Sequence, residues 1–251
     1  MIYFVGAGSG APDLITVRGA KLLGEADVIV YAGSLVNPAL LDYAKGDCAI
    51  YDSAKMTLEE VIAVMAPAAR AGKTVVRLHT GDPCVYGAHR EQMDALDRLG
   101  LAYEVCPGVS SFCGAAAALK AEYTLPNVSQ TVILTRMEGR TPVPEREQIE
   151  SLAAHGATMV IFLSAGQLEK LSAQLIEGGY APETPAAIVY KATWPDEKVV
   201  RTTVGELAAA GAREGITKTA LITVGGFLGD SYDRSKLYDP AFTTGFREAS
   251  R

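Results

Sequence analysis

One stretch of sequence decides the fold: Val75-Val76-Arg77-Leu78-His79-Thr80-Gly81-Asp82-Pro83-Cys84-Val85-Tyr86-Gly87-Ala88-His89-Arg90. Its apolar first part predicts a buried strand, and Gly81, Asp82 and Pro83 predict a turn, with a helix opening near Ala88. α/β proteins bind ligands at the carboxyl ends of parallel strands, and Gly81 would let the backbone approach a ligand closely. The same turn is equally well explained as a simple helix-capping turn, so the rest of the chain must decide.

Strands and helices alternate through the first half of the chain, which predicts a parallel sheet covered by helices on both faces. The expected helices span residues 16–25, 38–44, 90–99 and 115–119, and a further helix opens at a capping box formed by Thr57 and Glu60. The expected strands span residues 2–5, 27–31, 49–51, 74–78 and 101–105.

Three of these strands end in loops rich in glycine and other small residues, at residues 6–10, 81–87 and 108–114. Because the carboxyl ends of parallel strands lie along one edge, the three loops together predict a pocket. The first loop resembles a dinucleotide-binding fingerprint, but Pro12 and Asp13 lengthen it. The second strand ends at Ala32 and Gly33, where a nicotinamide site needs an acidic residue, so a nicotinamide or flavin cofactor is disfavoured.

The second half of the chain follows a different pattern after a break at residues 123–127. We expect strands at 129–136, 158–163, 186–190, 199–204 and 220–224, a polar excursion at 138–147 and a helix at 167–177. A short polar turn separates the third and fourth of these strands, so they are expected to pair antiparallel. The tail from Gly229 is polar and expected to be loosely held.

These patterns predict an α/β protein of two domains. Residues 1–120 would form an N-terminal domain with a mostly parallel five-stranded sheet and the glycine-rich loops. Residues 121–251 would form a C-terminal domain with a mixed sheet.

Composition excludes several classes of function. The 251 residues carry a formal net charge of −6, which gives no general attraction to nucleic acid or to anionic membranes. No apolar run reaches the roughly 18 residues of a membrane span, and the apolar start lacks the basic residues of a signal peptide. The cysteines show no paired metal-ligand spacing, which predicts buried thiols in the reducing cytoplasm and no metal site.

Five segments of the chain resemble one protein family. They are Val5-Gly-Ala-Gly-Ser9, Gly81-Asp-Pro-Cys-Val-Tyr-Gly87, Cys106-Pro-Gly-Val-Ser-Ser111, Val160-Ile-Phe-Leu-Ser164 and the turn after Val189. In these segments and their spacing the chain resembles, over almost its whole length, the tetrapyrrole methylases of the cobalamin and siroheme pathways. Members of that family use S-adenosylmethionine without a Rossmann domain and release S-adenosylhomocysteine.

The resemblance implies the class III methyltransferase fold, a homodimer, and a cofactor folded into a cleft between the two domains. Ser9 departs from the family, which usually has proline there, so the shape of the first loop is open. Siroheme-branch members carry an acidic residue, their proposed proton acceptor, near the position of Ala32 and Gly33. Its absence argues against that first branch enzyme and leaves any base unassigned. The implied cofactor contacts are Ser9, Thr80, Gly81, Asp82, Val85, Tyr86, Ser110, Ser111, Leu163 and Ala192.

Within the family, Tyr31-Ala-Gly-Ser-Leu-Val36 and Asp52-Ser-Ala-Lys-Met-Thr57 look most like the members that methylate carbon 11 of precorrin-4 in cobalamin synthesis. That substrate, without or with cobalt, is the leading interpretation. The alternatives are another corrin carbon such as C17 or C20, uroporphyrinogen III and, from a different class, a non-enzymatic cofactor sensor. The acidic charge and the absence of a basic tract disfavour an RNA substrate.

Methyl transfer from a sulfonium to carbon is an in-line displacement, so the protein mainly has to align donor and acceptor, which contributes about 7 to 11 kcal/mol. A carboxylate near the sulfonium would stabilise the ground state more than the transition state. We therefore expect Asp82 to orient the turn or a polar group of the cofactor and not to catalyse.

The substrate implied by the resemblance carries many carboxylates, so an acidic protein must supply positive charge locally. For each basic residue, an ordinary solvated surface charge is the alternative. The expected substrate ligands are His89, Arg90, Arg136 and Lys191, with Arg77 and Arg140 as further candidates.

Overall fold

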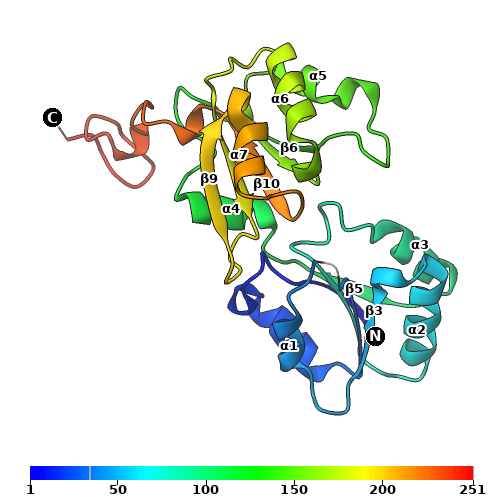
Figure 1. Cartoon of the computed structure of the whole chain (residues 1–251). Coiled ribbons are helices and arrows are strands. Elements are labelled where there is room, and N and C mark those ends of the chain that lie inside the picture. Colours follow the sequence, from blue (N-terminus) through cyan, green and yellow to red (C-terminus); the bar gives the residue numbers. More distant parts are fainter. Residues whose placement is uncertain (34, 251) are drawn as a thin grey trace. The chain divides into compact units, whose positions relative to one another are not determined.

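The computed structural model describes residues 1–33 and 35–250; Ser34, within one of the quoted segments, and Arg251 lie outside them. The chain divides into two compact units, Met1–Gly114 with Ala192–Asp196, and Ala115–Lys191 with Glu197–Arg251 (Figure 1). The expected domain boundary at residues 120 and 121 stays a prediction. Among the described residues, every helix is too short or too polar to span a bilayer.

The first unit is built on a fully parallel sheet, as the alternation of strands and helices predicts. Its strands are β1 Ile2–Gly6, β2 Val28–Tyr31, β3 Ala49–Asp52, β4 Val75–His79 and β5 Tyr103–Cys106, in the spatial order β3-β2-β4-β1-β5. Every pairing between these neighbours is parallel. The central strand β4 is buried at all of its residues, including the polar Arg77 and His79.

Helices cover both faces of this sheet (Figure 1). α1 (Val17–Glu25) lies on one face, where Leu23 is fully buried in a core that includes strand residues. α2 (Leu58–Arg70) and α3 (Arg90–Arg98) lie on the opposite face, where Leu96 is fully buried in a second core. Burying a side chain of this size contributes about 1.5 to 3 kcal/mol, so the two cores fix the helices on the sheet.

Side-chain caps fix where the first two helices begin. Thr16 Oγ1 accepts a hydrogen bond from Gly19 N at 3.0 Å, so Thr16 caps α1. At α2, Thr57 N donates to Glu60 Oε2 at 2.7 Å and Glu60 N donates to Thr57 Oγ1 at 3.3 Å. These two bonds confirm the capping box that the sequence predicts.

Two other helical segments, at residues 38–44 and 115–119, differ from the sequence prediction. The expected helix at 38–44 is a 3-10 helix over Pro38–Tyr43. α3 (Arg90–Arg98) matches the helix expected at 90–99, and the looser expectation of an opening near Ala88 fails because Ala88 has a φ of 47°, outside the helical region. α4 (Ser111–Leu119) begins earlier than residue 115, since the Ser110 carbonyl already accepts hydrogen bonds from the N–H groups that follow it.

The second unit carries the mixed sheet that the sequence predicts. Its strands are β6 Val132–Arg136, β7 Thr158–Phe162, β8 Pro185–Tyr190, β9 Lys198–Thr203 and β10 Ala220–Val224, in the spatial order β6-β7-β10-β8-β9. β6 and β7 pair in parallel, and the other pairings are antiparallel. The expected antiparallel pairing of β8 with β9 is therefore confirmed.

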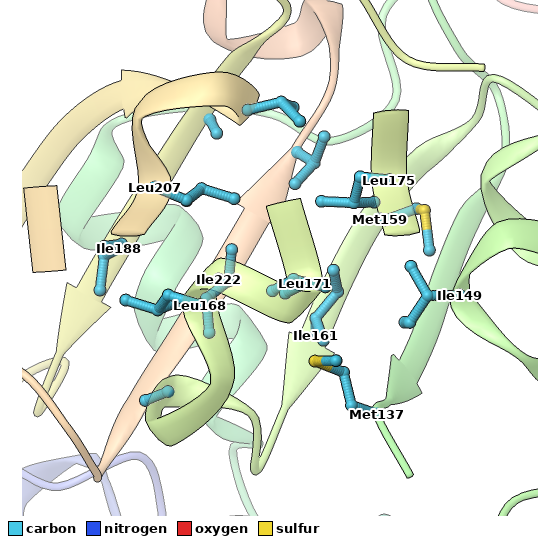
Figure 2. Packing of buried hydrophobic residues seen from close by; sticks show 14 of the residues in the cluster. Met137, Ile149, Met159, Ile161, Leu168, Leu171, Leu175, Ile188, Leu207 and Ile222 are labelled. Atoms are coloured by element: carbon cyan, nitrogen blue, oxygen red, sulfur yellow. The ribbon is translucent and has the colours of Figure 1, made fainter. Parts of the chain in front are cut away.

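Helices pack against this sheet around one large apolar core (Figure 2). α6 (Leu168–Glu177) was expected, and its Leu171 is fully buried beside Ile161 of β7. α5 (Ile149–Ala153) and α7 (Leu207–Arg213) were not expected. They have 5 and 7 residues, too few for a helical repeat of apolar positions to show in the sequence.

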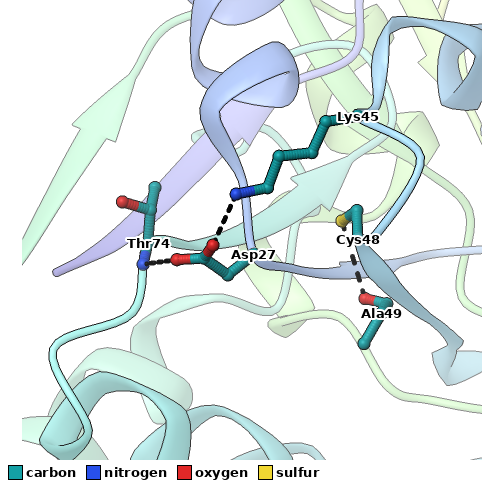
Figure 3. A network of polar contacts seen from close by, with 5 residues as sticks. All are labelled: Asp27, Lys45, Cys48, Ala49 and Thr74. Carbon is teal, nitrogen blue, oxygen red and sulfur yellow. Dashed lines mark hydrogen bonds and ion pairs between the residues drawn. The ribbon is translucent and has the colours of Figure 1, made fainter.

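One carboxylate ties together the amino ends of the strands in the first unit (Figure 3). Asp27 precedes β2 and accepts hydrogen bonds from Thr74 N, just before β4, at 2.8 Å and from Lys45 Nζ at 2.5 Å. The hydrogen bond from Lys45, followed by the one from Thr74 N, holds the pKa of the Asp27 carboxyl below its ordinary value. This network lies at the edge of the sheet opposite the glycine-rich loops.

Candidate active site

The three glycine-rich loops of the first unit touch one another at the carboxyl edge of the sheet. Gly8 and Gly81 exchange backbone hydrogen bonds, from Gly8 N to Gly81 O at 3.2 Å and from Gly81 N to Gly8 O at 3.0 Å. A Cβ on Gly6 would lie 2.5 Å from Gly108 Cα, and a Cβ on Gly108 would lie 2.3 Å from Gly81 O. No side chain fits between these backbones, so glycine is required where the loops meet.

Asp82 joins two of these loops. Its Oδ1 accepts a hydrogen bond from Cys84 N at 2.8 Å, and its Oδ2 accepts one from Gly108 N at 2.8 Å. Burial raises the pKa of Asp82, but the hydrogen bonds from Cys84 and Gly108 outweigh it and leave the pKa below its ordinary value. The carboxylate therefore orients the turn as an anion at neutral pH; its contact with a cofactor stays a prediction.

The shape of the first loop, which the sequence left open, is set by a distant residue. Ser9 is buried, and its Oγ lies 3.2 Å from Thr193 Oγ1, which also accepts a hydrogen bond from Ala11 N at 2.9 Å. Asn37 Nδ2 donates to Gly10 O at 2.9 Å. Sequence reasoning missed Thr193 because it lies 182 residues from Ala11 and no local motif links the two.

Most of the predicted cofactor residues of the first unit lie together at this edge. Gly81 packs against Ser110 and Ser111, since a Cβ on Gly81 would lie 3.5 Å from Ser110 Cα and from Ser111 N. The Ala192 carbonyl lies beside the first loop, 2.8 Å from the position of a Cβ on Gly10. Leu163 belongs to the second unit, where it follows β7 with 65% of its surface exposed.

The Thr80 hydroxyl provides a test of whether a polar ligand fits this edge. Thr80 Oγ1 is buried and has no hydrogen-bond partner among the described residues. Buried polar atoms in folded proteins are nearly always hydrogen-bonded, so this hydroxyl has capacity for a ligand. It stands next to Gly81, whose φ of 60° and lack of a side chain leave the backbone bare. These residues fit a small polar cofactor.

Several residues in the predicted site have strained backbones. Tyr86, Leu163, Lys191 and Thr193 have φ values of 54°, 53°, 45° and 68°. Non-glycine residues with positive φ cost energy and cluster at ligand sites and tight turns. Their presence in segments that the sequence assigns to cofactor and substrate binding supports a functional role for those segments.

The basic residues assigned to the substrate have partners of their own. Arg90 is exposed on α3 and pairs with Asp94 at 2.7 Å, one helical turn along. The Arg136 guanidinium donates to the carbonyl of the adjacent Met137 and to those of Thr141 and Pro142 in the following excursion. Lys191 Nζ lies 5.4 Å from the centroid of the Tyr190 ring. Contact of these residues with a substrate stays a prediction.

Two side chains differ from what the sequence suggested. Arg77 is buried at 6% exposure and is not a surface charge. An acidic residue does lie beside Gly33: Asp52 Oδ1 accepts a hydrogen bond from Gly33 N at 3.1 Å. Sequence reasoning missed Asp52 because it searched the end of the second strand and not of the third. Asp52 Oδ1 also accepts from Ala54 N at 2.8 Å, so this carboxylate holds two turns.

The cysteines are free thiols, but the expected burial is wrong for two of them. Cys84 and Cys113 are exposed, and Cys106 is buried. Cys84 lies in the loop after β4 and Cys113 in the first turn of α4, and both positions are more accessible than that of Cys106 at the end of β5. Within residues 1–33 and 35–250, no three His, Cys, Asp or Glu side chains gather where they could hold a metal ion.

A parallel sheet whose glycine-rich loops interlock at its carboxyl edge, followed in sequence by a mixed sheet, defines an α/β protein built to bind a small ligand there. The family of Tetrapyrrole (Corrin/Porphyrin) Methylases matches residues 1–208. The chain belongs to this family of methyltransferases.

Relatives of known activity match along nearly the whole chain. The chain is 55% identical over 251 residues to the cobalt-precorrin-4 C(11)-methyltransferase of Methanocaldococcus jannaschii, with 100% of this chain and 97% of that one covered. It is 45% identical over 242 residues to the precorrin-4 C(11)-methyltransferase of Mycobacterium tuberculosis, with 96% of each covered.

Solved structures share the fold. The X-ray structure of cobalt precorrin-4 methyltransferase, a cobalamin biosynthetic enzyme, matches with a TM-score of 0.89 and 51% identity over 91% of this chain and 96% of that one. Uroporphyrin-III C-methyltransferase from Thermus thermophilus, complexed with S-adenosyl homocysteine, matches with a TM-score of 0.73 and 28% identity over 90% and 92%. The expected fold class and family are thus confirmed.

Proposed function

We propose that this protein transfers a methyl group from S-adenosylmethionine to C11 of precorrin-4, and that cobalt-precorrin-4 is its preferred form of the substrate. The observation that carries the proposal is the identity of 55% over the full chain to an enzyme of that name. The relative at 45% identity is named a precorrin-4 C(11)-methyltransferase, which keeps precorrin-4 without cobalt as the alternative. The proposed setting is cobalamin synthesis in the cytoplasm, by a homodimer.

The cofactor proposal rests on the chemistry of the carboxyl edge of the first sheet. S-adenosylmethionine, when bound, supplies a methyl group on a positively charged sulfur. The backbone at Gly81 allows close approach of a ligand, and the Thr80 hydroxyl, which has no partner among the described residues, can hydrogen-bond to it. Ser110 and Ser111 lie against Gly81. We assign to these residues the alignment of the methyl donor, which is the main contribution that in-line transfer requires of a protein.

The hydrogen bonds that Asp82 accepts argue against a direct role of its carboxylate in methyl transfer. Both carboxylate oxygens accept backbone N–H groups, from Cys84 and from Gly108. A carboxylate committed in this way does not need the sulfonium as a partner, so it does not stabilise the charge that is lost during methyl transfer. Its proposed role is to hold the cofactor loop in shape, and no catalytic base is assigned.

We assign His89, Arg90, Arg136 and Lys191 to the carboxylates of the tetrapyrrole. The protein has a net charge of −6, so attraction to an anionic substrate must come from local groups such as these. Of the two in the first unit, His89 is held more firmly than the exposed Arg90, because its ring packs at 5.8 Å from that of Phe4 at the start of α3.

The test is an assay with methyl-labelled S-adenosylmethionine and either cobalt-precorrin-4 or precorrin-4. Mass spectrometry counts the methyl groups added, and carbon NMR locates the label on the ring. One label at C11, added faster to the cobalt form, is the expected result. A label on another carbon would refute the regiochemistry and leave a methyltransferase of the same family. Transfer to neither compound, with no binding of S-adenosylhomocysteine in calorimetry, would refute the proposal.

A further inference from the structure

A charged side chain is buried beneath the loop that follows β4. Arg77, at 6% exposure, donates from Nε to Gln92 Oε1 at 3.0 Å and from Nη1 to the Val30 carbonyl at 3.1 Å. Nη1 also donates to the Leu78 carbonyl at 3.4 Å, so these acceptors are all uncharged oxygens that do not neutralise the guanidinium. Burial lowers the pKa of Arg77 to about 10, so the guanidinium stays protonated at neutral pH.

Gln92 connects the Arg77 side chain to the loop that follows β4. Its side chain is also 6% exposed, and while Oε1 accepts from Arg77, Nε2 donates to the Ala88 carbonyl at 3.1 Å. An amide is the side chain that can accept on one side and donate on the other. Gln92 thus connects a strand residue at the centre of the sheet to a loop residue with a φ of 47°.

The turn that Gln92 holds is packed directly on the predicted cofactor loop. Gly87 lies so close to Pro83 that a Cβ on Gly87 would be 2.1 Å from the Pro83 carbonyl oxygen. Pro83 follows Asp82, whose carboxylate binds the next loop at Gly108. A continuous set of contacts therefore runs from Arg77 through Gln92 and the turn at residues 86–88 to the Gly81–Asp82 backbone.

His79 supports the same turn from the same strand. Arg77 and His79 are two residues apart on β4 and so point to one face of the sheet. The His79 ring is hydrogen-bonded to the Gly87 backbone. Burial, helped by the nearby charges of Arg77 and His89, lowers the pKa of His79 to about 3, so the ring is neutral at any pH near 7.

We propose that Gln92, anchored by Arg77, is a positioning residue that holds the turn Tyr86-Gly87-Ala88, whose first and last residues have positive φ, and thereby preorganises the Gly81–Val85 segment for the cofactor. The proposal rests on the proposed function, since it takes that segment to be the cofactor-binding one. A loop with strained residues at 86 and 88 needs such an anchor, because without it the backbone relaxes toward ordinary φ values.

Two substitutions separate the two hydrogen bonds of Gln92. Gln92→Glu keeps an acceptor for Arg77 but has no donor for the Ala88 carbonyl, whereas Gln92→Leu removes both bonds. Ser172→Ala is the matched control, because Ser172 Oγ donates to the Val204 carbonyl at 2.7 Å in the core of the second unit. It removes one buried hydrogen bond without touching the loop.

The first measurement is amide hydrogen exchange of the ligand-free proteins. In both Gln92 variants the amides of residues 84–89 should exchange about tenfold faster, the change expected for losing one anchoring hydrogen bond. In Gln92→Glu the amides of β4 should keep their protection, and in Ser172→Ala the loop should exchange as in the wild type. Loop protection that is unchanged in Gln92→Glu, or lowered equally in Ser172→Ala, would overturn the proposal.

The second measurement is calorimetric binding of S-adenosylhomocysteine. Its Kd should rise about fivefold or more in Gln92→Glu, because part of the binding free energy must then order the loop, and should stay at the wild-type value in Ser172→Ala. If the wild type and Gln92→Glu bind S-adenosylhomocysteine equally well, the role of Gln92 is refuted and the proposed function stands. A wild type that binds no S-adenosylhomocysteine would instead refute the proposed function.

Discussion

Gly6 and Gly108 meet each other and the Gly81 carbonyl backbone to backbone, and the two positions leave room for a hydrogen atom and nothing larger. The nearest approach is the 2.3 Å between a Cβ on Gly108 and the Gly81 carbonyl oxygen. The carbonyl oxygen belongs to the main chain and the Cβ position is fixed by it. Neither can move aside as the end of a flexible side chain would. At the scale of single residues, the loops can therefore meet only because these glycines have no Cβ atom.

Substituting one of these glycines should separate the loops. Gly108→Ala is expected to lower the free energy of unfolding by about 1 to 3 kcal/mol, the usual cost of forcing an extra carbon into a packed region, and to weaken binding of S-adenosylhomocysteine. Urea unfolding and calorimetry measure the two effects. Gly46→Ala is the control in the same unit, because a Cβ there would meet nothing within 4 Å. Equal behaviour of the two variants would contradict the close contact seen between the loops.

At the scale of elements, features set by neighbours in the sequence could be predicted, and features set by distant contacts could not. The capping box of Thr57 and Glu60 and the glycine-rich loops follow from residues within a few positions of one another. The role of Thr193 depends on Ala11, 182 residues away. The left-handed φ of Ala88, just before α3, could not be predicted, because nothing about an alanine indicates it.

The carboxylate at the amino ends of β2 and β4 makes sheet stability depend on pH. The pKa of Asp27 is lowered in the folded protein by the hydrogen bonds from Lys45 and then Thr74 N, so its contribution is present above the ordinary pKa of 3.8. It is lost as the pH falls through the lowered folded-state pKa. Asp27→Asn should therefore be less stable than the wild type at pH 7, and the difference should shrink as the pH approaches 3.

Urea unfolding of Asp27→Asn across this pH range measures the effect. Lys45→Met removes the same ion pair from its other side and should lose part of the same stability at pH 7. The double variant should lose less than the sum of the two single losses, because the pair can be broken once. A difference between wild type and Asp27→Asn that is constant from pH 7 to pH 3 would show that the carboxylate has no lowered pKa.

At the scale of the whole molecule, net charge and local charge act in opposite directions on the proposed substrate. A protein with a net charge of −6 repels a polyanionic tetrapyrrole at long range, while Arg90 and the other assigned basic residues attract it at contact. Salt screens both effects over a Debye length of about 10 Å at 0.1 M. The sign of the salt dependence therefore reports which charges control substrate binding.

If the assigned residues bind the substrate carboxylates, KM for the tetrapyrrole should rise with salt and kcat should change little, because screening weakens binding before it alters the aligned complex. Arg90→Ala should raise KM at low salt and reduce its salt dependence, since one of the screened contacts is gone. Arg98→Ala, which removes the last charge of the same helix, is the matched control and should keep the wild-type slope. A KM that falls with salt would show that net charge dominates, and equal slopes in the two variants would remove Arg90 from the substrate site.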